Sequence, residues 1–361
     1  MVRVALLSSW NALCGVSIHA ELVGRALLRM GHNLLVYAPR EYEDGVTHLY
    51  HAMDEDFVVR SYSFLRYGDR YTDEKLIDSL YFDPKPLLEG VFDLLIVEKP
   101  TSIPLGPLSR ALPRLRGRAR VMAVLHEGRM PENPYFKHLQ WDSVVVFDER
   151  FKHLFSPIYG QDLHIVPFPC HPLDSRDGHE ARRGLGLGDE AHIVFSFGRK
   201  PHRAELLLDS IEGLREDYPN LLLLFLTGDL GTYRAMQSMR QRYEFLEVRF
   251  GRPPTHELYD YLRAADAIVL ERGPPPQGYL AVSSSVHLCL GALTPIICSD
   301  VPYFDTFDGE VMRYRDARML MESLRRALEG KAHDVLERAR SFVEERSSDI
   351  IAERLLNIGL S

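Results

Sequence analysis

The stretch that decides the fold runs from Leu262 to Asp300 and reads LRAADAIVLERGPPPQGYLAVSSSVHLCLGALTPIICSD. Its pattern predicts a buried strand over Ala267–Leu270, a loop rich in Gly and Pro, a helix from about Ala281 and a second strand over Pro295–Cys298. In a parallel sheet, ligands bind beyond the carboxyl ends of the strands. The loop and the start of the helix are therefore expected to bind an anion, because a helix N-terminus offers free N–H groups.

The composition is that of a soluble globular protein: 361 residues, 45% hydrophobic and 26% charged, which is enough for two domains. A formal net charge of −8 argues against nucleic acid as the main partner, because neutralising phosphates needs an excess of Lys and Arg. No apolar run is long enough to span a bilayer, so membrane contact is expected to be peripheral at most. The cysteines are far apart and favour neither a zinc site nor disulfides, which fits a reducing cytoplasm: Cys14, Cys170, Cys289 and Cys298.

The chain opens with a strand, a helix and a second strand, predicted over Val2–Leu7, Ser17–Met30 and Asn33–Ala38. The first turn lacks the Gly-x-Gly-x-x-Gly pattern with which nicotinamide and flavin proteins hold a pyrophosphate. A dehydrogenase is therefore disfavoured.

The loop and helix of the opening stretch read Gln277-Gly278-Tyr279-Leu280, then Ser285, then Gly291 to Ile297. This resembles the donor-binding segment of family 4 retaining glycosyltransferases, which usually has an acid, Gly, an aromatic residue and Gly, a second acid eight positions after the first, and a Gly-x-Pro-Val-Val strand. The spacing is kept, with Gln277 and Ser285 at the two acid positions. Gln277 can hydrogen-bond a sugar hydroxyl without charge, and Ser284 and Ser285 can donate to a diphosphate. The alternative is an ordinary helix capped by serines.

Further donor-side positions follow from the same resemblance. The family carries Gly-Arg and then a Lys after the first strand of its second domain, and these cations hold the donor diphosphate. Here Arg199 matches the first cation, and Arg203 or Lys200 would take the place of the lysine. The backbone just after a later glycine meets the nucleotide base in the family, which makes Gly251 and Arg252 candidates for that contact.

On the acceptor side, the resemblance points to Gly15 and His126. The family has a Gly-Gly loop leading into its first helix, and Gly15 keeps one of these glycines; the alternative is a glycine that merely begins the helix. His126 ends a strand where the family has a histidine facing the cleft. It could bond a sugar hydroxyl or the developing charge, and its pKa would allow either protonation state near neutrality. The alternative is a histidine at a strand end that makes structural hydrogen bonds and has no role in binding.

Two segments lie outside the motifs. Residues 41–82 are rich in aromatic rings, which could stack on an acceptor sugar or simply pack locally. A cluster of arginines could hold an anionic head group or a phosphorylated acceptor, or form a solvated turn: Arg110, Arg114, Arg116, Arg118 and Arg120.

Together the resemblance implies an α/β protein with the glycosyltransferase B fold, two Rossmann-like domains facing each other across a cleft. The expected domains are residues 1–170 on the acceptor side and 171–346 on the nucleotide-sugar side, with a last helix at about 347–361 packing back on the first domain. The implied activity is transfer of a sugar from a nucleotide sugar to a hydroxyl of a glycan, lipid or small-molecule acceptor, with retention of anomeric configuration. No Asp-x-Asp pattern suggests a divalent cation, so neither metal nor cofactor is expected.

In the implied mechanism, Arg199 and Arg203 stabilise the departing diphosphate with help from Ser284 and Ser285, while Gln277 and His126 grip the sugar. Two other functions remain open. One is a protein of this fold that binds a nucleotide sugar or a glycan without catalysis, which the replaced acids would allow. The other is a sugar epimerase or phosphorylase on the same scaffold.

Overall fold

The computed structural model describes residues 1–42, 53–66, 68–160 and 163–361. The chain divides into two compact units. Unit 1 comprises Met1–Pro169, Gly278–Leu280 and Ser348–Ser361, and unit 2 comprises Cys170–Gln277 and Ala281–Ser347.

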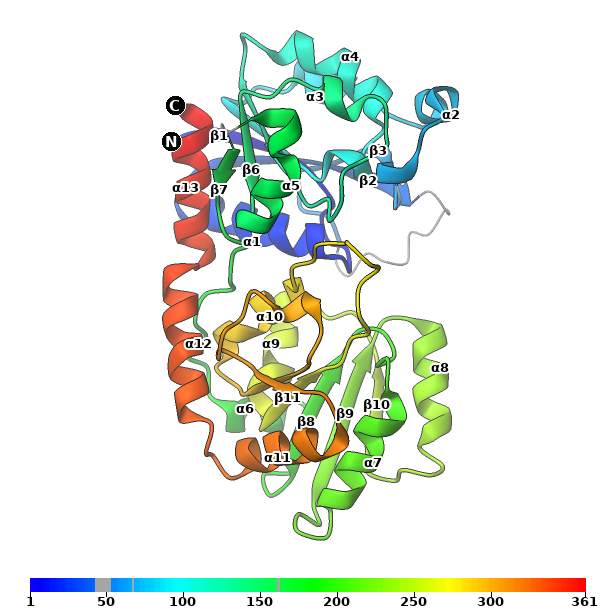
Figure 1. Ribbon diagram of the computed structural model, residues 1–361. Coiled ribbons are helices and arrows are strands. Elements are labelled where there is room, and N and C mark those ends of the chain that lie inside the picture. The colour runs from blue at the N-terminus through cyan, green and yellow to red at the C-terminus, as the bar shows by residue number, and fades with distance from the viewer. Residues whose placement is uncertain (43–52, 67, 161–162) are drawn as a thin grey trace. The chain divides into compact units, whose positions relative to one another are not determined.

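Unit 1 is built on a parallel sheet with the strand order β3-β2-β1-β4-β5-β6-β7 (Figure 1). Its strands are β1 (Arg3–Leu7), β2 (Asn33–Tyr42), β3 (Val58–Phe64), β4 (Leu94–Glu98), β5 (Arg120–Val124), β6 (Ser143–Val146) and β7 (Leu163–Ile165). Its α-helices are α1 (Gly15–Arg29), α2 (Glu74–Ser79), α3 (Lys85–Glu89), α4 (Leu105–Leu115), α5 (Glu149–Tyr159) and α13 (Ser348–Leu360). Short 3-10 turns lie at Gly68–Arg70, Pro100–Ser102 and Phe136–His138.

Unit 2 has its own parallel sheet, ordered β10-β9-β8-β11-β12-β13. Its strands are β8 (His192–Phe197), β9 (Leu221–Thr227), β10 (Leu246–Phe250), β11 (Ala267–Leu270), β12 (Ile296–Ser299) and β13 (Met312–Tyr314). Its α-helices are α6 (Gly178–Gly184), α7 (Ala204–Leu214), α8 (Leu230–Met239), α9 (Thr255–Ala264), α10 (Ser284–Cys289), α11 (Ala317–Leu328) and α12 (His333–Glu345). Short 3-10 turns lie at Leu290–Ala292 and Pro302–Phe304.

Both sheets are Rossmann-like, and in both the strand order reverses between the first and the fourth strand. In unit 1 the reversal lies between β1 and β4, and in unit 2 between β8 and β11. The first strand and the fourth strand pair side by side in parallel, so the loops that follow them leave the sheet in opposite directions. This crevice at the carboxyl ends of the strands is where such sheets bind their ligands.

The apolar runs predicted as strands are strands because they are buried on both faces. Every residue of β4 and of β11 is buried, as expected when helices cover both sides of a parallel sheet. The strand predicted over Ala267–Leu270 is confirmed residue for residue as β11. In unit 1, α13 packs against α1 (Figure 1). Arg29 of α1 forms an ion pair of 2.7 Å with Asp349 of α13.

Two local expectations are wrong. The helix expected from about Ala281 begins at Ser284, because Ser283 adopts an extended conformation and acts as N-cap, its Oγ accepting from the N–H of Val286 at 3.4 Å. The strand β3 was not predicted. It lies in the aromatic-rich segment 41–82, where Tyr62 and Phe64 are buried and therefore pack in the unit rather than stacking on a sugar.

Other aromatic residues of the segment 41–82 lie either outside the described residues or within unit 1. Tyr50 and Tyr67 lie outside the described residues, so an acceptor-binding role for them stays a prediction. Phe57 is described and packs edge-on against Trp10, with ring centroids 5.8 Å apart.

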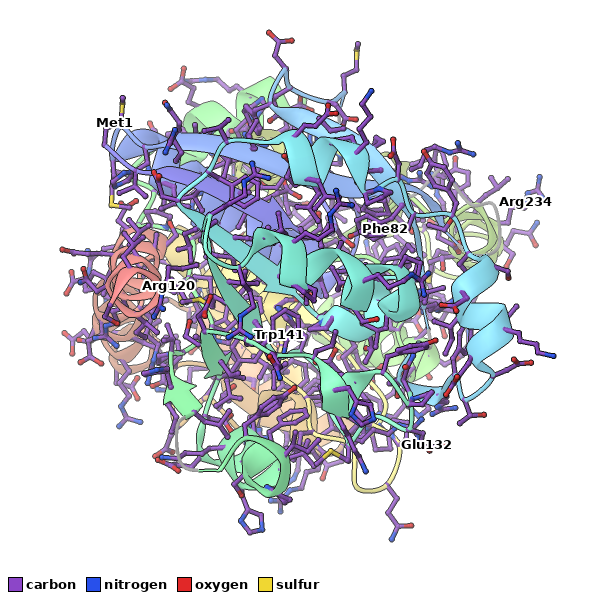
Figure 2. All side chains as sticks on the ribbon, turned by 90° about the horizontal axis from the view of Figure 1, so that it is seen from above. Met1, Phe82, Arg120, Glu132, Trp141 and Arg234 are labelled. Carbon is purple, nitrogen blue, oxygen red and sulfur yellow. The ribbon has the colours of Figure 1, made fainter. Side chains whose placement is uncertain are left out.

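Four of the five clustered arginines contact other residues of unit 1. Arg110 lies 3.2 Å from Asp78, Arg118 donates to the carbonyl of Leu88 at 2.6 Å, and Arg116 donates to Gln140 at 2.5 Å. Arg120, labelled in Figure 2, begins β5 and lies 3.9 Å from Asp142. These contacts favour the turn interpretation over a free anion-binding face. Within the described part of the chain, no helix has the length and apolar character required to cross a membrane.

Candidate functional site

The loop after β8 carries three of the predicted donor-binding cations. β8 ends at Phe197, and Gly198 follows with a φ of +101°, in the left-handed region that favours glycine, so the chain turns sharply into Arg199 and Lys200. Both side chains are exposed. The N–H of Lys200 donates to Thr232 Oγ1 at 3.2 Å, and its ammonium lies 3.9 Å from Glu205.

Arg203 lies deeper and joins the loops that follow β8 and β11. Its Nε donates to Glu271 Oε1 at 3.0 Å and its backbone N–H to Glu271 Oε2 at 2.9 Å. One terminal nitrogen donates to the carbonyl of Arg315 at 2.8 Å. The Glu271 side chain is fully buried, so Arg203 supplies the charge that a buried carboxylate needs. The Arg203 guanidinium also lies over the ring of Tyr314, 5.3 Å from its centroid.

The sequence interpretation missed Arg272, which follows Glu271. Its backbone is fixed by Ser299, whose Oγ accepts from the N–H of Arg272 and donates to its carbonyl, both at 2.9 Å. Arg272 is exposed, but the surrounding chain removes enough water to lower its pKa, and the positive charge of Arg199 acts in the same direction. Among the described residues neither guanidinium has an ion-pair partner. Two unpaired arginines thus lie near each other at the point where the strand order of unit 2 reverses.

The predicted base-binding pair is used within unit 2. The N–H of Gly251 donates to the carbonyl of Thr227 at 2.9 Å, and Arg252 donates twice to the carbonyl of Gly228, at 2.9 and 2.5 Å. Arg252 thereby ties the loop after β10 to the loop after β9. Contact of these residues with a base stays a prediction.

The remaining donor-side residues lie around the loop after β11. Gln277 is exposed in unit 2, and Gly278, with φ of +71°, belongs to unit 1. Ser284 and Ser285 are half-buried and are the first two residues of α10, while Ser283 is its cap. The first N–H groups of a helix have no partner within it, so both serines stand among free donors.

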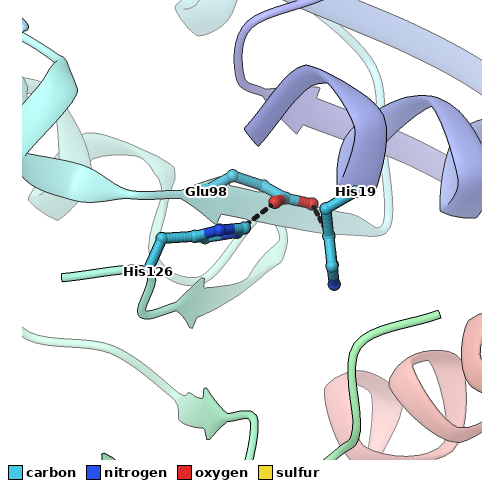
Figure 3. Close-up of side chains that lie close together, drawn as sticks. All are labelled: His19, Glu98 and His126. Atoms are coloured by element: carbon cyan, nitrogen blue, oxygen red, sulfur yellow. Dashed lines mark hydrogen bonds and ion pairs between the residues drawn. The ribbon is translucent and has the colours of Figure 1, made fainter. Parts of the chain in front are cut away.

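In unit 1, His126 shares a buried carboxylate with a second histidine (Figure 3). His126 Nε2 lies 2.7 Å from Glu98 Oε2, and His19 Nδ1 lies 2.8 Å from Glu98 Oε1. Glu98 is the last residue of β4, His19 lies on α1, and His126 follows β5. The sequence interpretation identified His126 and missed the other two residues.

The electrostatics of this cluster correct the expectation that His126 takes either protonation state near neutrality. Burial lowers the pKa of His126 to about 4, although its hydrogen bond to Glu98 acts in the opposite direction. Burial alone would raise the pKa of Glu98, but the two histidines outweigh it and lower that pKa to about 2. At neutral pH, Glu98 is therefore an anion and His126 is a neutral imidazole.

Histidine and glutamate are also residue types that ligate transition metals, and the three potential ligand atoms lie within 4.8 Å of one another. In this structure the two ring nitrogens that could ligate an ion face the carboxylate of Glu98 at hydrogen-bond distance. The arrangement as it stands is therefore a hydrogen-bonded cluster.

Gly15 is the first residue of α1 and follows Cys14, whose sulfur caps the helix by accepting from the N–H of Ser17 at 3.4 Å. This position agrees with a glycine that begins a helix, and a contact with substrate stays a prediction. Within the described part of the chain, the buried hydroxyl of Ser8, which directly follows β1, has no hydrogen-bond partner.

A signal for the missed residues was present in the sequence. Glu98 and Glu271 are the acidic residues at the ends of the apolar runs LLIVE and AIVLE. A carboxylate at the end of a buried strand needs a partner from a neighbouring strand end. His19 lies among the apolar positions of its helix, flanked by Val16 and Val23. What the sequence lacked was the strand order that brings these side chains together.

Solved structures share this architecture over the whole chain. Sucrose-phosphate synthase from Thermosynechococcus elongatus matches with a TM-score of 0.64 and 17% identity, covering 99% of this chain and 98% of its own. The chain has the glycosyltransferase B fold. HepE of Anabaena in complex with UDP-glucose matches with a TM-score of 0.63 and 12% identity over 99% of both chains. An α,α-trehalose 6-phosphate synthase from Burkholderia multivorans matches with a TM-score of 0.60 and 12% identity, covering 99% and 98%. No protein-family model matches the sequence.

Proposed function

We propose that this protein with the glycosyltransferase B fold transfers a sugar from a nucleotide sugar to an acceptor hydroxyl. The observation that carries the proposal is the pair of unpaired arginines, Arg199 and Arg272, at the switch point of the unit 2 sheet. Their mutual repulsion is relieved by an anion with two or more charges, which a nucleotide diphosphate supplies. Structural neighbours that are glycosyltransferases, one of them bound to UDP-glucose, support the same choice.

The donor side of the mechanism rests on positive charge. Arg199 and Arg272 bind the diphosphate, and Arg203, fixed by Glu271, adds a third positive charge. The first turn of α10, with Ser284 and Ser285, adds hydroxyl and N–H donors. These groups stabilise the negative charge that grows on the diphosphate as the bond to the sugar breaks. Because these groups supply the positive charge, we propose that transfer needs no metal. We also propose that it proceeds with retention of anomeric configuration.

The acceptor side rests on a neutral histidine. His126 is uncharged at neutral pH, so it accepts a hydrogen bond from a sugar or acceptor hydroxyl instead of supplying positive charge. The acceptor is a glycan, a lipid or a small molecule with a free hydroxyl. The leaving diphosphate takes the acceptor proton on the same face of the sugar.

Calorimetry with UDP, GDP and ADP tests the donor site. Arg199→Ala should weaken binding of the preferred diphosphate by about 1.5–3 kcal/mol, the range for a charge-assisted hydrogen bond, and Arg272→Ala should act similarly. The matched control is Arg318→Ala, an exposed arginine of α11 whose removal should change nothing. Unchanged affinity in both Arg199→Ala and Arg272→Ala would contradict the placement of the diphosphate.

A second function deserves the same test, because Gln277 and Ser285 occupy positions where the resembling family has acids. A binding protein would saturate with donor without consuming it, whereas a transferase slowly hydrolyses its own donor. Turnover in EDTA with rates equal to those in magnesium would support the metal-free transferase. Turnover that disappears in EDTA and returns with magnesium or manganese would show that a metal is required. A requirement for free phosphate would indicate a phosphorylase.

A further inference from the structure

Glu98 sits where the topology of unit 1 brings three chain segments together. It is the last residue of β4, which pairs with β1 on one side and with β5 on the other. The helix after β1 supplies His19, and the loop after β5 supplies His126. One carboxylate therefore reaches both imidazoles, because the carboxyl ends of adjacent parallel strands are neighbours.

The hydrogen bonds of the cluster determine where its protons lie. An ionised carboxylate only accepts, so each nitrogen that faces Glu98 must carry a hydrogen: Nδ1 of His19 at 2.8 Å and Nε2 of His126 at 2.7 Å. In a neutral imidazole the second nitrogen then holds a lone pair. For His126 this nitrogen is Nδ1. In Figure 3 the second ring nitrogen of His19 points away from Glu98.

Packing holds the rings in these orientations. The ring centroid of Phe147 lies 4.8 Å from that of His126 and 5.5 Å from that of His19. Phe168 lies 5.1 Å from His19, and the two imidazoles are nearly perpendicular at 5.1 Å. Rotation of either ring would leave a buried carboxylate oxygen without a donor, which is costly. The His126 side chain is 8% exposed, against 2% for His19 and 0% for Glu98, so it is the most exposed of the three.

We propose that Glu98 is a positioning residue for sugar transfer: it holds His126 in the Nε2–H tautomer, so that Nδ1 accepts a hydrogen bond from a substrate hydroxyl. The inference rests on the proposed function and adds to it a residue that never touches substrate. His19 occupies the second oxygen of Glu98 and keeps the carboxylate from turning toward water. A metal bound by the same three residues is the competing interpretation, and the experiment below separates the two.

The tautomers can be read directly from the wild-type protein. In full-length protein with ¹⁵N-labelled histidine, long-range ¹H–¹⁵N spectra should show His126 protonated at Nε2 and unprotonated at Nδ1, and His19 protonated at Nδ1. His19→Gln and His126→Gln assign the two signals. A wild-type His126 protonated at Nδ1 would overturn the proposal without any variant having to fold or turn over substrate.

Glu98→Gln tests whether the carboxylate of Glu98 fixes the tautomers of the two histidines. The amide has the same shape, but its oxygen accepts from one imidazole while its NH₂ faces the other, which must adopt the opposite tautomer to bond with it. One of the two histidine signals should therefore change pattern. The matched control is Glu127→Gln, which alters the buried carboxyl next to His126 in sequence, whose Oε1 accepts from the N–H and the hydroxyl of Thr101. Both histidine signals should stay unchanged in that control.

The kinetic readout separates positioning from a general structural role. Glu98→Gln should lower kcat at least tenfold while its Kd for the donor, which is bound in unit 2, stays within twofold of wild type. Glu127→Gln should stay within twofold for both. Unchanged tautomers and unchanged kcat in Glu98→Gln would overturn the proposal while leaving the proposed function intact.

The remaining outcomes are also decisive. One equivalent of tightly bound zinc in purified protein, with histidine signals that shift when it is chelated, would replace the proposal with a metal site. If no donor is consumed by wild type, the proposed function and the role of Glu98 in transfer fail together. If donor is consumed and Arg199→Ala impairs donor binding while Glu98→Gln is as active as wild type, only the inference fails.

Discussion

The two sheets place a buried carboxylate at the same topological position and give it different partners. β4 in unit 1 and β11 in unit 2 are both the fourth strand of a Rossmann-like order, and both lead to a glutamate with no exposed side-chain surface, Glu98 and Glu271. Glu98 is held by two imidazoles, whereas Glu271 is held by the permanently charged Arg203. The topology decides where a polar group is needed, and the partner decides how that group responds to pH and to ligand.

The difference extends to the surroundings of each carboxylate. Around Glu98 the neighbours are aromatic and the histidines are almost fully buried. Next to Glu271 lies a pair of unpaired arginines, and the loop between β11 and α10 is largely exposed. Unit 1 therefore offers neutral hydrogen-bonding groups, and unit 2 offers positive charge. In the proposed reaction these properties suit an acceptor hydroxyl and a diphosphate respectively.

The largest effect is expected from breaking the unit 2 pair. Arg203→Ala leaves Glu271 as a buried charge without its cation, a change that costs about 3–5 kcal/mol of unfolding free energy in fully buried pairs. Because one third of the Arg203 side chain is exposed, we expect the lower part of that range. Urea denaturation measures it.

The double variant Arg203→Met with Glu271→Gln is the control for this prediction, since it removes both charges and should recover at least half of the loss. A single Arg203→Ala variant as stable as wild type would show that Arg203 is not needed to neutralise Glu271. The proposed difference between the carboxylate partners of the two units would then not hold.

The next effect is the pH dependence of unit 1. The pKa of His126 falls from 6.5 to about 4 on folding, so between these values the unfolded chain binds more protons and stability falls as the pH falls. The difference corresponds to about 3 kcal/mol as an order of magnitude, lost between pH 6.5 and pH 4. Glu98, with its pKa lowered to about 2, acts in the same direction from about pH 4.5 downward.

Melting temperature or urea midpoint measured from pH 7 to pH 4 tests this prediction. His126→Gln keeps an N–H donor toward Glu98 but cannot titrate, so its stability should depend less on pH in this window by roughly one bound proton. His256→Gln, at an exposed histidine, is the control and should follow wild type. Parallel curves for wild type and His126→Gln would show that His126 titrates as an ordinary exposed histidine.

The smallest effect concerns the caps of the helices that follow the two switch-point strands. Ser283 Oγ and Cys14 Sγ each accept from a backbone N–H at 3.4 Å at the starts of α10 and α1. Ser283→Ala should cost about 1 kcal/mol, and Cys14→Ala less, because sulfur is a weak acceptor. Ser284→Ala should leave stability unchanged, since that residue lies inside the helix. A larger loss for Ser284→Ala than for Ser283→Ala in thermal unfolding would mean that the helix begins elsewhere.

The sequence by itself determined the class of the fold and most of its elements. The short apolar run Ala267–Leu270, followed by a loop rich in Gly and Pro, indicates a buried strand, and the amphipathic pattern of Ser17–Met30 indicates a helix. His126 and Arg199 were predicted from the resemblance to family 4 glycosyltransferases. Both follow strands in the structure, and in a parallel sheet such ends line the ligand crevice. The sequence did not predict β3, because this edge strand contains polar and aromatic residues with no clear period of two.

Only the tertiary structure decided what those strand ends do together. His19 and Glu98 are 79 residues apart in sequence, and Arg203 and Glu271 are 68 apart, yet each pair is in direct contact. No local pattern encodes such contacts, because they depend on which strands are neighbours in the sheet. The same holds for protonation: His126 is neutral because it is buried beside Phe147, and the order of β1, β4 and β5 places it against the carboxylate that fixes its tautomer.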